Sequence, residues 1–193
     1  MRALDLPWPL PRRTDVRDEL LAAYGTGRGY HDLRHLTEVL ARLAELGRGD
    51  DVEVVLAAWF HDAVYDGGTD LEERSALLAR ARLAGEDVDV DEVVRLVRLT
   101  ADHRPASDDP RGHALVDADL AILAAPPERY DEYRRAVRTE YAQVPEPQFR
   151  AARRAVLQDL ADRRRLFHTA HGHARWDAPA RANLAREIVE LSD

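Results

Sequence analysis

The dipeptide His61-Asp62 ends a wholly apolar run, in the stretch "LAAWFHDAVYDGG" that begins at Leu56. The apolar run 54–60 is typical of a protein interior. Burying an imidazole and a carboxylate together costs free energy unless both are compensated. A divalent cation compensates both, because it neutralises the carboxylate and takes a nitrogen lone pair at about 2.0–2.2 Å. For the pair on its own, a hydrogen-bonded couple without an ion is the simpler alternative.

Two other segments supply candidate ligands. His31 and His35 lie four residues apart in "YHDLRHL", so on one helix they would share a face, about 40° apart. Asp119 lies in the otherwise apolar "LVDADLAIL", where Asp117 would point to another side of the helix. Imidazole and carboxylate ligands suit Mn, Fe, Co, Ni or Zn, and carboxylates also suit Mg. These segments therefore predict a divalent metal ion as cofactor.

The elements that must position these residues are expected to be helices. Alanine, leucine, arginine and glutamate dominate, and apolar residues recur at spacings of three and four, with no persistent strand alternation. The pattern predicts an all-α fold of about nine helices in a single domain, 1–193, with an extended segment at 1–13 and a C-terminal helix within 176–193. "DDPRG" and "HTAHGHARWDAP" are expected to be loops with surface histidines. The expected helices cover about 14–24, 31–46, 51–65, 70–85, 90–102, 114–124, 127–143, 147–167 and 180–191.

Composition excludes several kinds of chemistry. All 28 basic residues are arginine, so a lysine nucleophile or Schiff base is ruled out, and no cysteine is present for thiolate chemistry. The net charge of −8 argues against a nucleic-acid partner. No stretch approaches the ~20 apolar residues of a membrane span, and "MRALDLPWPLPRR" lacks the apolar core of a signal peptide. We therefore expect a cytoplasmic protein with no membrane partner.

The order of these residues along the chain resembles a known family. His, then His-Asp, then Asp on an all-helical chain resembles the HD superfamily of metal-dependent phosphohydrolases, most closely its small stand-alone bacterial members. The resemblance runs over about 30–191. It is carried by the motifs "YHDLRHL", "LAAWFHDAVYD", "LEERSA", "LVDADLAIL", "VRTEYAQV" and "ARANLAREI".

The resemblance implies a function and a set of ligands. The fold would be an HD-type helical bundle, and the reaction would be hydrolysis of a small phosphate ester or nucleotide by water bound to the metal. The metal ligands would be His35, His61, Asp62 and Asp119, with Asp117 in reserve for Asp119. Four protein ligands leave open positions on an octahedral ion for water and substrate. Monoesterase, diesterase and nucleotidase activities are not distinguished, and no oligomeric state is predicted.

His31 has a second resemblance. Cyclic-nucleotide phosphodiesterases, distant HD relatives, carry a Tyr-His-Asn-x-x-His segment in which the first histidine is the general acid and the second binds metal. The segment here is "YHDLRH", in which Asp32 replaces the asparagine. The resemblance implies that His31 is the catalytic acid. The alternative is a histidine that caps the helix or supports a ligand.

Further residues are candidates for a second metal, for phosphate binding or for support of the ligands. One histidine closes a helix in the interval where two-metal HD proteins bind their second ion. Two acids follow the His-Asp pair and could act as a base, support a ligand or cap a helix. Two arginines near the ligand segments could hold phosphate bidentately. With the reserve aspartate, the set is His103, Asp66, Glu73, Arg34, Arg74 and Asp117.

Two other functions fit the same residues. Some HD-fold proteins hold two irons and oxidise substrates with dioxygen, but they need more ligands than the four named above. A non-catalytic module that binds metal or nucleotide for regulation is the second alternative, because fold does not imply activity. The expected partner in the leading interpretation is a small phosphorylated substrate.

Overall fold

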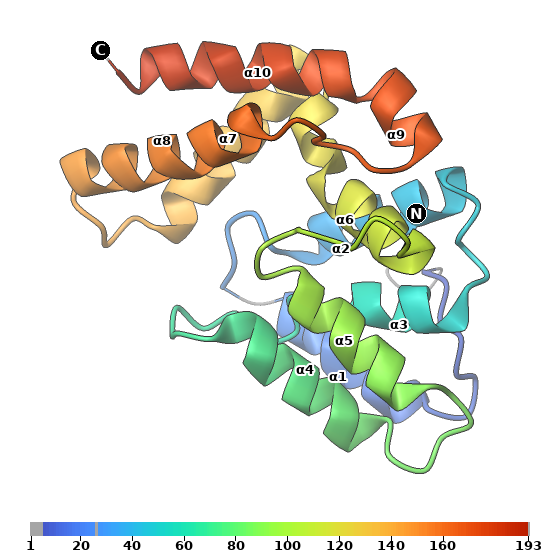
Figure 1. Ribbon diagram of the computed structural model, residues 1–193. Helices are drawn as coiled ribbons and strands as arrows, with labels where there is room; N and C mark the ends of the chain where they lie inside the picture. Colours follow the sequence, from blue (N-terminus) through green and yellow to red (C-terminus); the bar gives the residue numbers. More distant parts are fainter. Residues whose placement is uncertain (1–5, 26, 193) are drawn as a thin grey trace. The chain divides into compact units, whose positions relative to one another are not determined.

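The computed structural model describes residues 6–25 and 27–192, and within them it is all-helical with no strand. Ten α-helices and one short 3₁₀ helix, η2, make up this described part, which confirms the all-α prediction (Figure 1). The chain forms two compact units, Met1–Ala118 and Asp119–Asp193. No helix in the described ranges is long and apolar enough to cross a membrane.

The N-terminal unit is built around its most apolar helix. This unit contains α1 (Thr14–Tyr24), α2 (Leu33–Glu45), α3 (Val52–Phe60), α4 (Leu71–Arg82), α5 (Val90–Leu99) and most of α6 (Pro110–Leu120). Helix α3 packs against α2, α4 and α5, while α4 and α5 lie side by side (Figure 1). A helix that is apolar on every side is stable only when it is buried on every side. The run that precedes His61 is therefore the centre of this unit.

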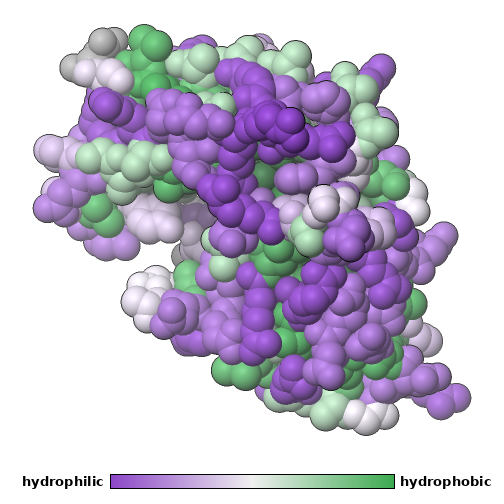
Figure 2. All heavy atoms as spheres, in the orientation of Figure 1, coloured by the Kyte–Doolittle hydropathy of each residue, from purple (hydrophilic) through white to green (hydrophobic). Residues whose placement is uncertain are grey.

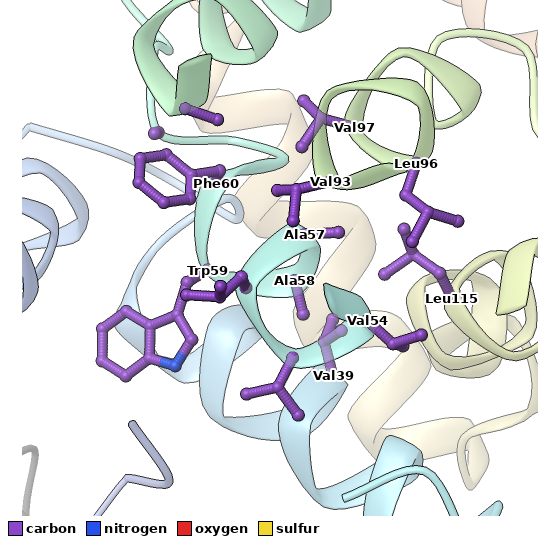
Figure 3. Close-up of a cluster of buried hydrophobic side chains, with 14 of the residues drawn as sticks. Val39, Val54, Ala57, Ala58, Trp59, Phe60, Val93, Leu96, Val97 and Leu115 are labelled. Atoms are coloured by element: carbon purple, nitrogen blue, oxygen red, sulfur yellow. The ribbon is translucent and has the colours of Figure 1, made fainter. Parts of the chain in front are cut away.

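The low exposure of this run confirms that it lies at the centre of the unit. Every residue of 54–60 is at most 2% exposed. Figure 3 shows side chains of α2, α5 and α6 gathered around this helix. Helix α5 presents only its apolar side to it, as its period of three and four predicts. Hydrophilic side chains cover most of the face of α4 and α5 seen in Figure 2, with apolar residues between them.

The C-terminal unit contains the end of α6, then η2 (Ala121–Ala124), α7 (Pro127–Glu140), α8 (Glu146–Asp162), α9 (Ala170–Arg175) and α10 (Asp177–Glu190). Helix α10 packs against η2, α8 and α9. The buried Glu187 carboxylate accepts hydrogen bonds from the Tyr130 hydroxyl at 2.6 Å and from Arg153 Nε at 2.9 Å. Arg153 also donates to the Tyr133 hydroxyl at 2.9 Å. The network compensates the buried charge, so we assign it a structural role.

Asn183→Ala is expected to destabilise the protein by about 1–3 kcal/mol. The buried Asn183 amide nitrogen donates to the carbonyls of Leu123 and Ala125, both at 2.9 Å, so truncation leaves two acceptors without this donor. Urea unfolding followed by circular dichroism measures the change. Val189→Ala on the same helix is the control, because Val189 is 63% exposed. Equal stability of both variants would contradict the bridging role of Asn183.

Two predicted loops are wrong. Helix α6 begins at Pro110, inside "DDPRG", because Asp109 accepts a hydrogen bond from the Gly112 backbone at 2.9 Å and proline is favoured at the first helical position. Helix α9 lies inside "HTAHGHARWDAP", where the Thr169 hydroxyl accepts from the Gly172 backbone at 2.9 Å. Helix α9 is the element missing from the predicted nine.

Two predicted helix ends near the histidines are also wrong. Helix α2 begins at Leu33 rather than 31, because Asp32 is its N-cap. Helix α3 ends at Phe60 rather than 65; the Val64 backbone donates instead to the Ser75 hydroxyl at 3.0 Å. His31 is therefore outside the helix that holds His35, and the prediction that both share one helical face is wrong. Residues 6–13 contain no helix or strand, and the rest of the predicted extended segment, 1–5, lies outside the described residues.

Candidate metal centre

The N-terminal cap of α2 places His35. The Asp32 carboxylate accepts hydrogen bonds from the backbone of Arg34 at 2.8 Å and of His35 at 3.1 Å. Such a cap satisfies backbone donors that the first helical turn leaves open. It fixes where the helix starts, and so places His35 in the first turn, facing the interior with 2% exposure.

The end of α3 places His61 and Asp62. His61 is the C-cap of the helix, and its backbone still donates to the Ala57 carbonyl at 2.9 Å. Since the helix before it is buried, its ring is carried into the interior, where His61 is 2% exposed. The Asp62 side chain is 13% exposed and follows at the turn where the helix ends. The sequence thus brings a carboxylate and an imidazole to one buried helix terminus.

Three side-chain atoms converge at this point. His35 Nε2 lies 3.0 Å from His61 Nε2 and 3.4 Å from Asp62 Oδ2, and the distance from His61 Nε2 to Asp62 Oδ2 is 3.0 Å. Ligand atoms about 2.1 Å from an ion lie about 3.0 Å apart at right angles and about 3.4 Å apart at the tetrahedral angle. The spacing of the triad, His35, His61 and Asp62, therefore fits neighbouring ligands of one cation.

The hydrogen bonds of the triad support the same interpretation. His61 Nδ1 lies 2.8 Å from the Ala58 carbonyl, which can only accept, so Nδ1 carries the proton. With the proton on Nδ1, the neutral form of the ring keeps its Nε2 lone pair toward the triad, the arrangement found for metal-binding histidines. Asp62 Oδ2 is buried and has no hydrogen-bond partner among the residues that the structure describes. A buried acceptor without a hydrogen bond costs free energy. A cation bound here would contact this oxygen and also the nitrogen lone pairs of both imidazoles.

Asp62 is held in its ionised form. Burial by itself raises the pKa of Asp62, but the three nearby imidazoles, His61 and His31 first and then His35, outweigh it and hold the pKa well below its usual range. An ionised carboxylate beside two imidazoles supplies the harder oxygen ligand and the nitrogen ligands of a transition-metal site.

His31 lies beside the triad on the chain segment before α2. Its ring stacks on Tyr65, with centroids 4.3 Å apart and planes 26° apart, and meets the His35 ring edge-on at 5.6 Å. It is not one of the three converging ligands, yet it is near enough to lower the pKa of Asp62. Its role as a general acid stays a prediction.

Three of the further candidates, two acids and one arginine outside the triad, form ion pairs. Asp66 accepts two hydrogen bonds from Arg74, at 2.8 and 2.6 Å, which lower the pKa of Asp66 to about 2. Glu73 in the first turn of α4 pairs in the same way with Arg98 of α5. All four side chains are substantially exposed. Their roles in phosphate binding or in support of the ligands stay predictions.

The remaining candidates lie on other elements. Arg34 pairs with Glu38 at 3.2 Å on the exposed side of α2. His103 follows α5 with a φ of 54°, a left-handed backbone that costs free energy for a residue with a side chain. Asp117 is fully buried in α6 and outside the triad. Asp119 belongs to the C-terminal unit, and its role as fourth ligand stays a prediction.

Arg28 is a residue near the triad that the motifs did not single out. It precedes "YHDLRHL" and donates hydrogen bonds to the main chain of both ligand-bearing segments. Its partners are carbonyl groups, which every residue type carries, so no side-chain pattern in the sequence marks it.

Comparisons with protein-family models, with curated proteins and with solved structures found no match. The resemblance to HD phosphohydrolases therefore rests on the motifs themselves, and the family stays a prediction.

Proposed function

We propose that this protein is a metal-dependent phosphohydrolase that acts on a small phosphate ester or nucleotide. The observation that carries the proposal is the convergence of two imidazole nitrogens and one carboxylate oxygen within 3.0–3.4 Å. When bound there, a divalent ion would lower the pKa of water and offset negative charge on a phosphoryl group. Asp119 is the proposed fourth ligand, with Asp117 in reserve.

The residues of the chain would bind the ion and donate the proton that the reaction needs. His35, His61 and Asp62 would hold the ion from one side, because all three approach from the ends of two helices. His31, whose ring lies beside the triad, would act as the general acid and give a proton to the leaving oxygen of the ester. Its stack on Tyr65 would keep the ring in place during that transfer.

The test begins with the metal. The protein is stripped with a chelator, titrated with Mn²⁺, Fe²⁺, Co²⁺, Ni²⁺, Zn²⁺ and Mg²⁺, and assayed with each ion on nitrophenyl mono- and diesters and then on nucleotides and alkyl phosphates. We expect saturable binding and hydrolysis that depends on the added ion. Asp62→Asn is the matched variant, because it keeps the shape of the side chain and removes its charge.

Three results of this test would overturn the proposal. Failure to bind any of the ions would refute the metal site itself. Binding without turnover of any ester would favour the regulatory module. Oxygen uptake by an iron-loaded protein that hydrolyses nothing would favour an oxygenase.

A further inference from the structure

The Arg28 guanidinium joins the two segments that carry the triad. Nη1 donates to the His31 carbonyl at 2.9 Å and to the Asp62 carbonyl at 2.6 Å, while Nη2 donates to the Ala63 carbonyl at 3.0 Å. The first acceptor directly precedes the N-cap of α2, and the other two directly follow His61, the C-cap of α3. One planar group thus ties together chain segments more than 30 positions apart in sequence.

Two aromatic rings fix the guanidinium. Its central carbon lies 4.7 Å from the centre of the Tyr24 ring and 5.7 Å from that of Tyr65, within range of cation–π attraction. The same two tyrosines touch the candidate site: the Tyr24 hydroxyl accepts from the Asp62 backbone at 3.3 Å, and Tyr65 stacks on His31. Both backbone polar groups of Asp62 are therefore held, one by Arg28 and the other by Tyr24.

The choice of partners distinguishes Arg28 from the surface arginines of the same unit. Arg74, Arg82 and Arg98 each make a double hydrogen bond to a carboxylate. Arg28 is half-buried and binds three carbonyls, with no carboxylate among its partners in the described ranges. Holding three carbonyls at once needs several donors in one rigid plane, which lysine lacks.

We infer that Arg28 is a positioning residue that presets the distance between the two metal-binding segments. This inference rests on the proposed function, because the distance matters only if the triad binds an ion. Arg28 bonds the carbonyl of Asp62 and so holds the backbone that carries the Asp62 carboxylate. It also bonds the carbonyl of His31, which directly precedes the N-cap of the helix that holds His35. A ligand set that is held in place before the ion arrives loses less conformational freedom on binding.

Arg28→Met and Arg28→Lys test the inference, with Arg82→Met as control. Arg82 pairs with Glu19 on the surface of the same unit, so its loss removes a charge of equal sign without touching the triad. The dissociation constants of Zn²⁺ and Mn²⁺ are measured by competition with a chromophoric chelator, on stripped protein that circular dichroism shows to be folded. The melting temperature of each stripped variant is recorded alongside.

We expect Arg28→Met to bind both ions about 10–100-fold more weakly, the usual effect of losing a group that orients metal ligands. The metal affinity of Arg28→Lys should lie between that of Arg28→Met and that of the unchanged protein, since an ammonium group reaches fewer carbonyls. Arg82→Met should bind within about twofold of the unchanged protein, in line with the small energetic role of exposed ion pairs.

The outcomes separate this inference from the proposed function. If the unchanged protein binds metal and folded Arg28→Met binds it equally well, Arg28 has only a structural role and the inference fails alone. A lower melting temperature with unchanged affinity would likewise limit Arg28 to a structural role. If the unchanged protein binds none of the six ions titrated above, the proposed function itself fails; if it binds only one of the other four, that ion replaces Zn²⁺ and Mn²⁺ in the comparison. Should Arg28→Met not fold, Arg28→Lys decides, and unchanged affinity in that variant would overturn the inference.

Discussion

His61→Ala is expected to take up no divalent metal, and its hydrolytic activity is expected to fall by about 10³-fold or more. The ring supplies the nitrogen closest to both other ligands, 3.0 Å from His35 Nε2 and 3.0 Å from Asp62 Oδ2. Without it, one imidazole and one carboxylate remain of the three converging ligands. A bound ion is worth several kcal/mol of transition-state stabilisation, and about 1.4 kcal/mol corresponds to a tenfold change in rate.

Metal content by mass spectrometry and turnover of a nitrophenyl ester measure the two effects. His113→Ala is the matched control: its Nε2 bonds the Ala106 carbonyl at 2.8 Å, and it is not part of the triad. Asp62→Asn gives an independent test if the alanine variant folds poorly, because the amide preserves the volume of the side chain. Full metal occupancy in both site variants would refute the metal centre.

Periodicity of apolar residues predicted where helices exist, and capping decided where they begin. The buried run 54–60 needed only its composition to be placed at the centre of the N-terminal unit. The starts of α2, α6 and α9 depend instead on side-chain caps, made by Asp32, Asp109 and Thr169. Each of these residues is a favoured N-cap type, so the sequence carries a signal for all three starts that is separate from apolar periodicity.

The candidate site was predictable in its residue types but not in its geometry. A histidine at the end of a buried helix, beside an aspartate and one helix away from another histidine, predicted that the three could meet. Their 3.0–3.4 Å separations depend on how α2 packs against α3, which is long-range packing. The role we infer for Arg28 had no sequence signal at all, since one arginine among 28 resembles the others until its carbonyl partners are seen.

The wrong helix start at 31 changes how His31 should be understood. A histidine on the same helical face as His35 would have been fixed by the helix. Instead, His31 precedes the Asp32 cap and is held by the stack of its ring on Tyr65 and by the Arg28 bond to its carbonyl. Neither Tyr65 nor Arg28 belongs to the triad, and the carbonyl bond does not depend on the ring. Removal of the His31 ring should therefore leave the triad intact.

His31→Ala is accordingly expected to keep its metal while kcat falls about 10²–10⁴-fold, the usual contribution of a general acid. Its melting temperature should change little, because one aromatic stack is worth about 0.5–1.5 kcal/mol. The loss should depend on the leaving group. Nitrophenolate departs without a proton, so nitrophenyl phosphate should be affected less than an alkyl phosphate, whose alkoxide must be protonated as the bond to phosphorus breaks.

The comparison of the two substrates distinguishes the roles open to His31. Tyr65→Phe is the control, because it keeps a ring for His31 to stack on and removes only the hydroxyl. An equal loss on both esters with metal retained would mean that His31 binds the phosphoryl group rather than protonating the leaving oxygen. Loss of metal from His31→Ala would mean that His31, not His35, is the ligand, and would reverse the assignment of the two histidines. Only a loss concentrated on the alkyl ester, in a protein that holds its metal, supports the acid role.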